Sequence, residues 1–116
     1  MRITNGQVEV VLTALASVMA SVVLPTAEAC DTAEVLVALE VAHKKIGLVE
    51  APIFAGRTTI TTDGDPDAIT RLNEFRALEC DVEIPTLALA TIKNSDGKVN
   101  AGHIALLLRT GIITNA

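Results

Sequence analysis

The chain has 116 residues and carries nine Lys+Arg against fourteen Asp+Glu, a formal net charge of −5. Half of the residues are hydrophobic, yet the chain has no Trp or Tyr and two Phe, so its core must be built from small aliphatic side chains. The scattered basic residues and the scarcity of aromatics predict no nucleic-acid partner. The length fits a single domain, residues 1–116, and so apolar a chain is expected to bury part of its surface in an assembly.

The first apolar stretch, residues 10–24, has fifteen uncharged residues and ends just before Ala27-Glu28-Ala29. This arrangement is compatible with a signal peptide, but Glu28 lies inside the cleavage motif. A polar residue also recurs at every fourth position, at Glu9, Thr13, Ser17 and Ser21. That spacing predicts an amphipathic helix over residues 6–23 with Asn5 as its N-cap. The stretch is too short for a membrane span, so we expect no membrane partner.

A long helix is predicted between Pro25 and Pro52, over residues 26–51. One stripe of this helix is apolar and should face inward: Val35, Leu39, Ala42, Ile46 and Val49. The charged residues fall away from that stripe: Glu34, Glu40, Lys44 and Lys45. Together with the first helix it should form an antiparallel helical hairpin, preceded by a short strand at residues 2–4.

A third helix is predicted over residues 66–79, after a turn at residues 62–66, with Asp65 as N-cap and Pro66 as first helical residue. Its inward positions are Ile69, Leu72, Phe75 and Leu78, and its outward positions are Arg71, Asn73, Glu74 and Arg76. Residues 82–92 alternate in polarity and read as an extended element that changes phase at Pro85.

A turn at residues 94–97 leads to a last helix over residues 101–110, capped by Asn100 and ended by Gly111. The predicted fold is therefore α+β and mostly helical. It comprises an antiparallel helical hairpin with a long central helix, a short third helix, a small extended or β element and a short C-terminal helix.

The strongest metal signal is acidic: Asp63, Asp65, Asp67 and Glu74 occupy positions 1, 3, 5 and 12 of an EF-hand-like loop. The sixth position, which requires Gly, is Ala68, so we interpret the acids as a helix N-terminus. The histidines, His43 and His103, form no local ligand pair with Cys30 or Cys80. We therefore predict no metal and no cofactor, and two unpaired thiols.

No catalytic residues are predicted. The sequence has no G-x-S-x-G, no cysteine next to a histidine and no Gly-rich phosphate loop. The acids near residue 81 (Glu79, Asp81 and Glu83) read as a solvated edge. We expect a protein that is not an enzyme and has no small-molecule substrate.

The predicted partner contacts are apolar positions in the extended segment and near the two ends. Residues 82–89 could accept a strand from another chain through an exposed edge, or could pack on the helices of this chain. The candidates are Ile3, Val82, Ile84, Leu87, Leu89, Ile112 and Ile113.

Several features together resemble an uncharacterised family of short tailed-bacteriophage proteins. They are the opening Ile3-Thr4-Asn5-Gly6, Ala14-Leu15 in the first helix, Leu24-Pro25 before the long helix, Leu78-Glu79, Asp81-Val82-Glu83-Ile84-Pro85 and Val99-Asn100. The resemblance covers nearly the whole chain as an order of segments and carries over no site residues.

The resemblance implies a structural protein of a phage particle, capsid-associated or in the neck or tail. Such a protein is made in the host cytoplasm and binds other phage structural proteins or copies of itself. An accessory factor outside the particle, such as an assembly chaperone or an inhibitor of a host protein, is the alternative. A calcium-dependent module resting on the acids at residues 63–67 is a third hypothesis, which a calcium titration of the melting temperature tests.

Overall fold

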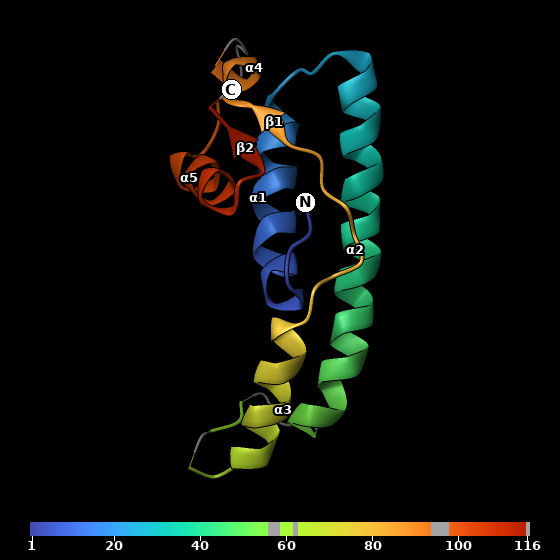
Figure 1. Ribbon diagram of the computed structural model, residues 1–116, viewed down its shortest axis with the longest axis vertical. Coiled ribbons are helices and arrows are strands. Elements are labelled where there is room, and N and C mark those ends of the chain that lie inside the picture. Colours follow the sequence, from blue (N-terminus) through green and yellow to red (C-terminus); the bar gives the residue numbers. More distant parts are fainter. Residues whose placement is uncertain (56–58, 62, 94–97, 116) are drawn as a thin grey trace.

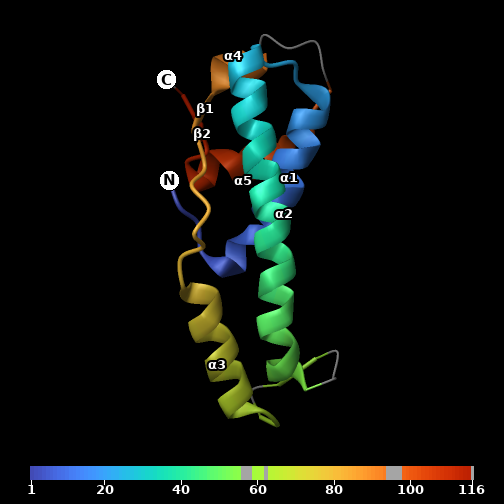
Figure 2. The ribbon, with the colours of Figure 1, turned by 90° about the vertical axis from the view of Figure 1, so that its right-hand side faces the viewer.

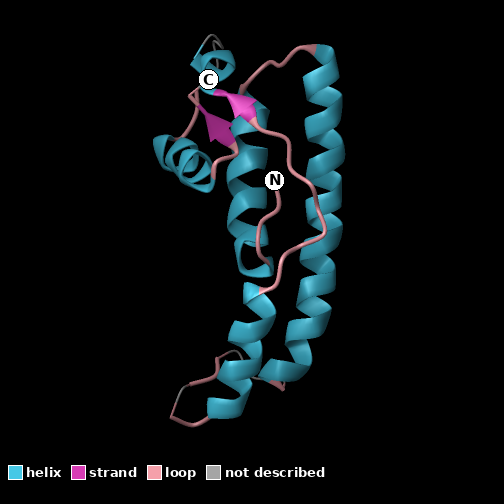
Figure 3. Cartoon of the chain, in the orientation of Figure 1, coloured by secondary structure: helices cyan, strands magenta, loops and turns pink. Residues whose placement is uncertain are grey.

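The computed structural model describes residues 1–55, 59–61, 63–93 and 98–115. Its longer helices line up along one long direction, giving a molecule of 50 × 24 × 21 Å, and the last helix lies across them (Figure 1). The predicted α+β, mostly helical architecture is confirmed: helices dominate and one small parallel sheet lies at one side (Figure 3). The antiparallel hairpin of the first two helices is present, and its two arms differ greatly in length.

The first arm begins as a 3-10 turn, η1 (Asn5–Gln7), and continues as α1 (Val8–Ser21). Its inward side chains supply much of the core: Val8, Val11, Ala14, Leu15 and Val18. The prediction of Asn5 as N-cap was wrong, because Thr4 takes that position and its N–H donates to Gln7 Oε1 at 3.0 Å. Asn5 instead joins two elements: its Nδ2 donates to the carbonyl oxygen of Phe75 at 3.1 Å.

The second arm, α2 (Thr26–Phe54), has 29 residues and runs the length of the molecule (Figures 1 and 2). It starts after Pro25 as predicted, but Pro52 does not end it. A proline removes one N–H donor, and so near a helix end it disturbs little of the remaining ladder. The helix closes at Ala55, which adopts a left-handed conformation (φ 52°) and donates its N–H to the carbonyl of Ala51.

The third helix, α3 (Pro66–Ala77), begins as predicted, with Asp65 at the N-cap position and Pro66 at the first turn. It ends two residues before the predicted boundary, since Leu78 is extended and exposed rather than inward. The four positions predicted outward (Arg71, Asn73, Glu74 and Arg76) are exposed. Thr62, in the predicted turn, lies outside the described residues.

An extended segment, residues 79–86, leads to β1 (Leu87–Ala88), which pairs in parallel with β2 (Ile113–Thr114). The prediction of extended structure up to residue 92 was wrong at its end, because Leu89–Lys93 form a short helix, α4. This helix buries Ile92, three residues after Leu89, a spacing that places both side chains on one face of a helix and would place them on opposite faces of a strand. The predicted strand at residues 2–4 is a single antiparallel bridge between Thr4 and Glu79. The predicted turn at residues 94–97 lies outside the described residues.

The last helix, α5 (Ala101–Thr110), has the predicted bounds. The side chain of Asn100 accepts hydrogen bonds from the N–H groups of Gly102 and His103, which satisfies orphan donors of the first turn. Gly111 ends the helix with φ 84°, a conformation that favours glycine. Helix α5 packs on α1, and the core lies where α1, α5, the sheet and the extended segment meet.

Candidate interaction surface along the long helix

The residues predicted to contact partners lie in the core of the chain itself. Five of them are buried, with at most 5% of each side chain's surface exposed: Ile3, Ile84, Leu87, Ile112 and Ile113. Val82 and Leu89 are partly buried against the same cluster. The structure thus packs these side chains on this chain's own elements, which for residues 82–89 was the second of the two alternatives.

Backbone hydrogen bonds explain why these segments are held inside one chain. The N–H of Cys80 donates to the carbonyl of Ile3 at 2.8 Å, and Ile84 N–H donates to Met1 O at 2.8 Å. The N–H of Leu87 donates to the carbonyl of Ile112 at 2.7 Å. The two predicted contact regions near the chain ends are therefore ordered by the extended segment between them.

Helix α2 is the least covered element of the hairpin. Two of its 29 residues are buried, Thr32 and Leu39, and Thr32 Oγ1 donates to the carbonyl of Glu28 within the helix. Large apolar side chains remain exposed, with exposed fractions of 59% for Val37, 46% for Val41, 76% for Leu48 and 48% for Val49. An apolar helix surface of this kind is normally covered by another element or another chain.

The sequence predicted the inward face of α2 and missed its outward face. Leu39 is buried, and three neighbours on the stripe pack partly against the core: Val35, Ala42 and Ile46. Val49, the last member of the predicted stripe, is almost half exposed. The missed signal was the second apolar row at Val37, Val41 and Leu48, which lie on the opposite side at helical spacing.

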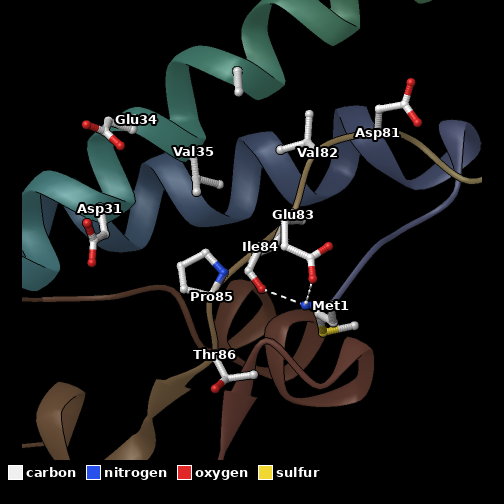
Figure 4. Close-up of a pocket in the computed structure, with 11 residues that line it drawn as sticks. Met1, Asp31, Glu34, Val35, Asp81, Val82, Glu83, Ile84, Pro85 and Thr86 are labelled. Carbon is white, nitrogen blue, oxygen red and sulfur yellow. Dashed lines mark hydrogen bonds and ion pairs between the residues drawn. The ribbon is translucent and has the colours of Figure 1, made fainter.

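Beside α2, the extended segment leaves an open groove of about 660 Å³ (Figure 4). Its floor is apolar and combines Val35 and Ala38 of α2 with Val82 and Ile84 of the extended segment. Acidic side chains surround this floor: Asp31 and Glu34 from the helix, and Asp81 and Glu83 from the extended segment. The groove therefore offers an apolar strip with a negative rim.

One of these acids is partly neutralised within the chain. The amino group of Met1 donates to the carbonyl of Ile84 at 2.9 Å and lies 3.6 Å from Glu83 Oε1 (Figure 4). The guanidinium of Arg2 approaches the other oxygen of Glu83, with Nε to Oε2 at 3.3 Å. These contacts fix the N-terminal segment against residues 83–84 and leave the negative charge of the rim concentrated on Asp31, Glu34 and Asp81.

A second groove of about 500 Å³ continues along α2 toward its C-terminal half. The two grooves share Ala38, Asp81 and Val82, so they form one trough between α2 and the extended segment. We call it the α2 trough. Its second half is lined mainly by apolar side chains: Val41, Ala42, Ile46, Val49, Phe75 and Cys80. Charged side chains line both halves: Asp31, Glu34, Asp81 and Glu83 in the first, and Lys45, Glu79 and Asp81 in the second.

An ion pair fixes the far end of α2 to α3. Arg76 reaches Glu50 with two hydrogen bonds, Nη2 to Oε1 at 2.9 Å and Nε to Oε2 at 3.3 Å. The hydrogen bond to Glu50 raises the pKa of Arg76 above its ordinary value, and burial opposes that rise. The guanidinium therefore stays charged over the whole range in which the protein would be studied.

The histidine, cysteine and acidic side chains do not gather into one site in the described part of the chain. Among the described residues, no three His, Cys, Asp or Glu side chains come close enough to hold a metal ion. The ring of His103 lies 2.9 Å from Ser17 Oγ through Nδ1, which links α5 to α1. Neither cysteine forms a disulfide: Cys80 is buried and Cys30 is exposed on α2.

In the described part of the chain, no helix combines the length and apolar character that crossing a membrane requires. No protein-family model, curated protein or solved structure matches the chain.

Proposed function

We propose that the chain works by binding other protein chains through α2, as a structural component of a tailed-phage particle. The observation that carries this proposal is the apolar surface of α2, where Val37, Val41, Leu48 and Val49 are between 46% and 76% exposed. Burying a fully exposed side chain of this type is worth about 1.5–3 kcal/mol, so covering the part that remains exposed here is worth roughly half to three quarters of that for each residue. A helix with several of these positions on its surface gains most when a second protein covers it.

The phage assignment rests on the resemblance of the sequence to short tailed-bacteriophage proteins. The acidic and dispersed charge agrees with a role away from the packaged genome, because a genome contact needs clustered basic residues. Within a particle, the chain would be capsid-associated or would belong to the neck or tail. It would be made in the host cytoplasm and would then enter the assembling virion.

The test compares purified virions with lysate of infected cells by quantitative mass spectrometry, for the phage that encodes the chain. We expect the chain in intact particles at a fixed ratio to the major capsid protein, and resistant to a salt wash. A chain abundant in lysate but missing from intact particles would overturn the proposal. That outcome would instead support a non-virion accessory factor, such as an assembly chaperone or an inhibitor of a host protein.

A further inference from the structure

The exposed side of α2 follows a heptad repeat. Its positions alternate in steps of three and four residues, which places them within an arc of about 120° on the helix. All eight are exposed, and we call them the α2 seam: Ala27, Cys30, Glu34, Val37, Val41, Lys44, Leu48 and Ala51. The buried residues of the helix, Thr32 and Leu39, lie on the opposite side. Figure 2 looks onto this helix, which has no other element in front of it.

A repeat of three and four residues is the period at which two helices pack along a common seam. The inward stripe of α2 through Leu39 has this period too, and it packs on the core of this chain. The α2 seam repeats the period on the opposite side of the helix, where its residues are exposed. Six of the eight seam positions are uncharged, and two carry a charge, Glu34 and Lys44. These two charges determine which partner and which orientation the seam can accept.

Glu34 and Lys44 lie at equal distances along the helix on the two sides of Leu39. We propose that a second copy of this chain covers the seam, with the two α2 helices antiparallel and related by a two-fold axis at the level of Leu39. Each Glu34 then faces Lys44 of the other copy. The remaining positions form layers of apolar or small side chains: Ala27 with Ala51, Cys30 with Leu48, and Val37 with Val41.

Charge complementarity selects the antiparallel orientation. In a parallel pair with the same register, Glu34 would face Glu34 and Lys44 would face Lys44, and both layers would be repulsive. The flanking charges are mixed: Asp31 and Lys45 lie eight and six residues from Leu39 on one edge of the seam and attract each other, whereas Glu40, on the other edge and one residue from the axis, meets Glu40 of the other copy. The antiparallel orientation therefore rests on the Glu34–Lys44 layers. The inference rests on the proposed function, since it names the partner that α2 binds.

The first test measures self-association by sedimentation equilibrium. The wild type should form a dimer of twice its 12.1 kDa mass. Glu34→Lys and Lys44→Glu each create two repulsive layers, and each should raise the dimer dissociation constant at least about tenfold. An equimolar mixture of the two variants should dimerise again, because every layer then joins opposite charges.

Two matched controls distinguish an effect of the α2 seam from a general effect of changing charge or removing an exposed apolar side chain. Glu74→Lys makes the same charge change at an exposed position of α3, and Val23→Ser removes an exposed apolar side chain outside the seam. Both should leave the dissociation constant unchanged, whereas Leu48→Ser should raise it. Circular dichroism of each variant verifies that the monomer still folds.

The second test fixes the register with a disulfide. In the proposed dimer, Cys30 faces Leu48 of the other copy, so Leu48→Cys should cross-link rapidly into a covalent dimer under mild oxidation. Two copies of Cys30 are separated by about 27 Å along the seam, at about 1.5 Å of rise per residue, so the wild type should not cross-link. The double variant Cys30→Ser/Leu48→Cys should not cross-link either.

A protein that stays monomeric up to about 1 mM overturns this inference, because a specific dimer should form well below that concentration. A dimer that is insensitive to Glu34→Lys, or whose Leu48→Cys variant gives no cross-link, overturns the seam and its register. The proposed function is decided separately by the virion comparison. A monomer found in particles contradicts the dimer alone, and a dimer absent from particles contradicts the particle role alone.

Discussion

Leu39 and Val37 are two residues apart on α2 and have opposite environments. Leu39 is fully buried against α1 and the core, whereas the side chain of Val37 is 59% exposed. A helix turns about 100° per residue, so two neighbours at this spacing face opposite sides. At the scale of single residues, this pair tests which side of α2 faces the core.

Leu39→Asp should destabilise the fold severely, by more than about 3 kcal/mol, because it buries an unpaired carboxylate. Val37→Asp makes a comparable change on the exposed side and should shift the free energy of unfolding of the monomer by less than about 0.5 kcal/mol. Urea denaturation followed by circular dichroism at low protein concentration measures both. Equal stability of the two variants would contradict the assigned inward face.

A pair of glycine substitutions tests backbone conformation with one chemical change. Gly111 has φ 84°, so Gly111→Ala should cost about 1 kcal/mol from the left-handed backbone. Gly47 lies inside α2, and an added Cβ would have no atom within 4 Å other than its chain neighbours and the backbone of its own helix, so Gly47→Ala should gain about 0.5–1 kcal/mol. Thermal melting of the two variants should therefore shift in opposite directions, and a shared direction would contradict the φ assignment at Gly111.

At the scale of elements, the sequence predicted those helices whose ends carry their own signals. Two local signals predicted helix ends: Asp65-Pro66 for the start of α3, and Asn100 and Gly111 for the two ends of α5. These boundaries were correct. The helix at Leu89–Lys93 was missed because Leu87 and Leu89 alternate as in a strand, although only Leu87 belongs to β1. The strand that pairs with β1, β2, is also distant in sequence. The predicted end of α2 at Pro52 was wrong because a proline disrupts a helix little when few helical residues follow it, and only Ile53 and Phe54 follow Pro52.

The candidate surface was harder to predict than the helices. The prediction for α2 described one inward stripe through Leu39 and placed only charged residues away from it. Val37, Val41 and Leu48 were then overlooked, although their spacing is as regular as that of the inward stripe. Conversely, Ile84 and Ile113 were predicted at a surface, because a sequence alone does not show that two distant extended segments cover each other.

The junction of α2 and α3 depends on the Glu50–Arg76 pair, which is partly exposed. Glu50→Gln should lower stability by up to about 1 kcal/mol, as expected for a surface pair with two hydrogen bonds. A double-mutant cycle with Arg76→Gln isolates the coupling, and the double variant should lose less than the sum of the single losses. Full additivity in the cycle would show that the pair contributes nothing to the junction.

At the scale of the whole molecule, burial is uneven along the long axis. Helix α1 contributes five buried residues and α3 contributes one, Leu72. The α3 end is joined to the remainder through η1, the Glu50–Arg76 pair and contacts with the end of α2. The two ends of the molecule should therefore differ in local stability.

Hydrogen exchange followed by mass spectrometry measures this difference directly. We expect the amides of α3 to exchange through local opening, at rates well above those of α1, which should exchange only on global unfolding. Leu72→Ala should speed exchange in α3 and leave α1 nearly unchanged. Equal protection of α1 and α3 would mean that the molecule opens as a single cooperative unit.

The bonds that join residues 1–4 to residues 79–84 also bear on how the chain reaches its structure. Each helix can begin to form from neighbours in sequence, but the core of α1 stays open until segments about 80 residues apart meet. Closing so large a loop costs chain entropy before any contact compensates for it. We therefore expect folding kinetics slower than those of a helical bundle of this size, with the α1–α2 hairpin forming early and the N-terminal pairing completed near the rate-limiting step.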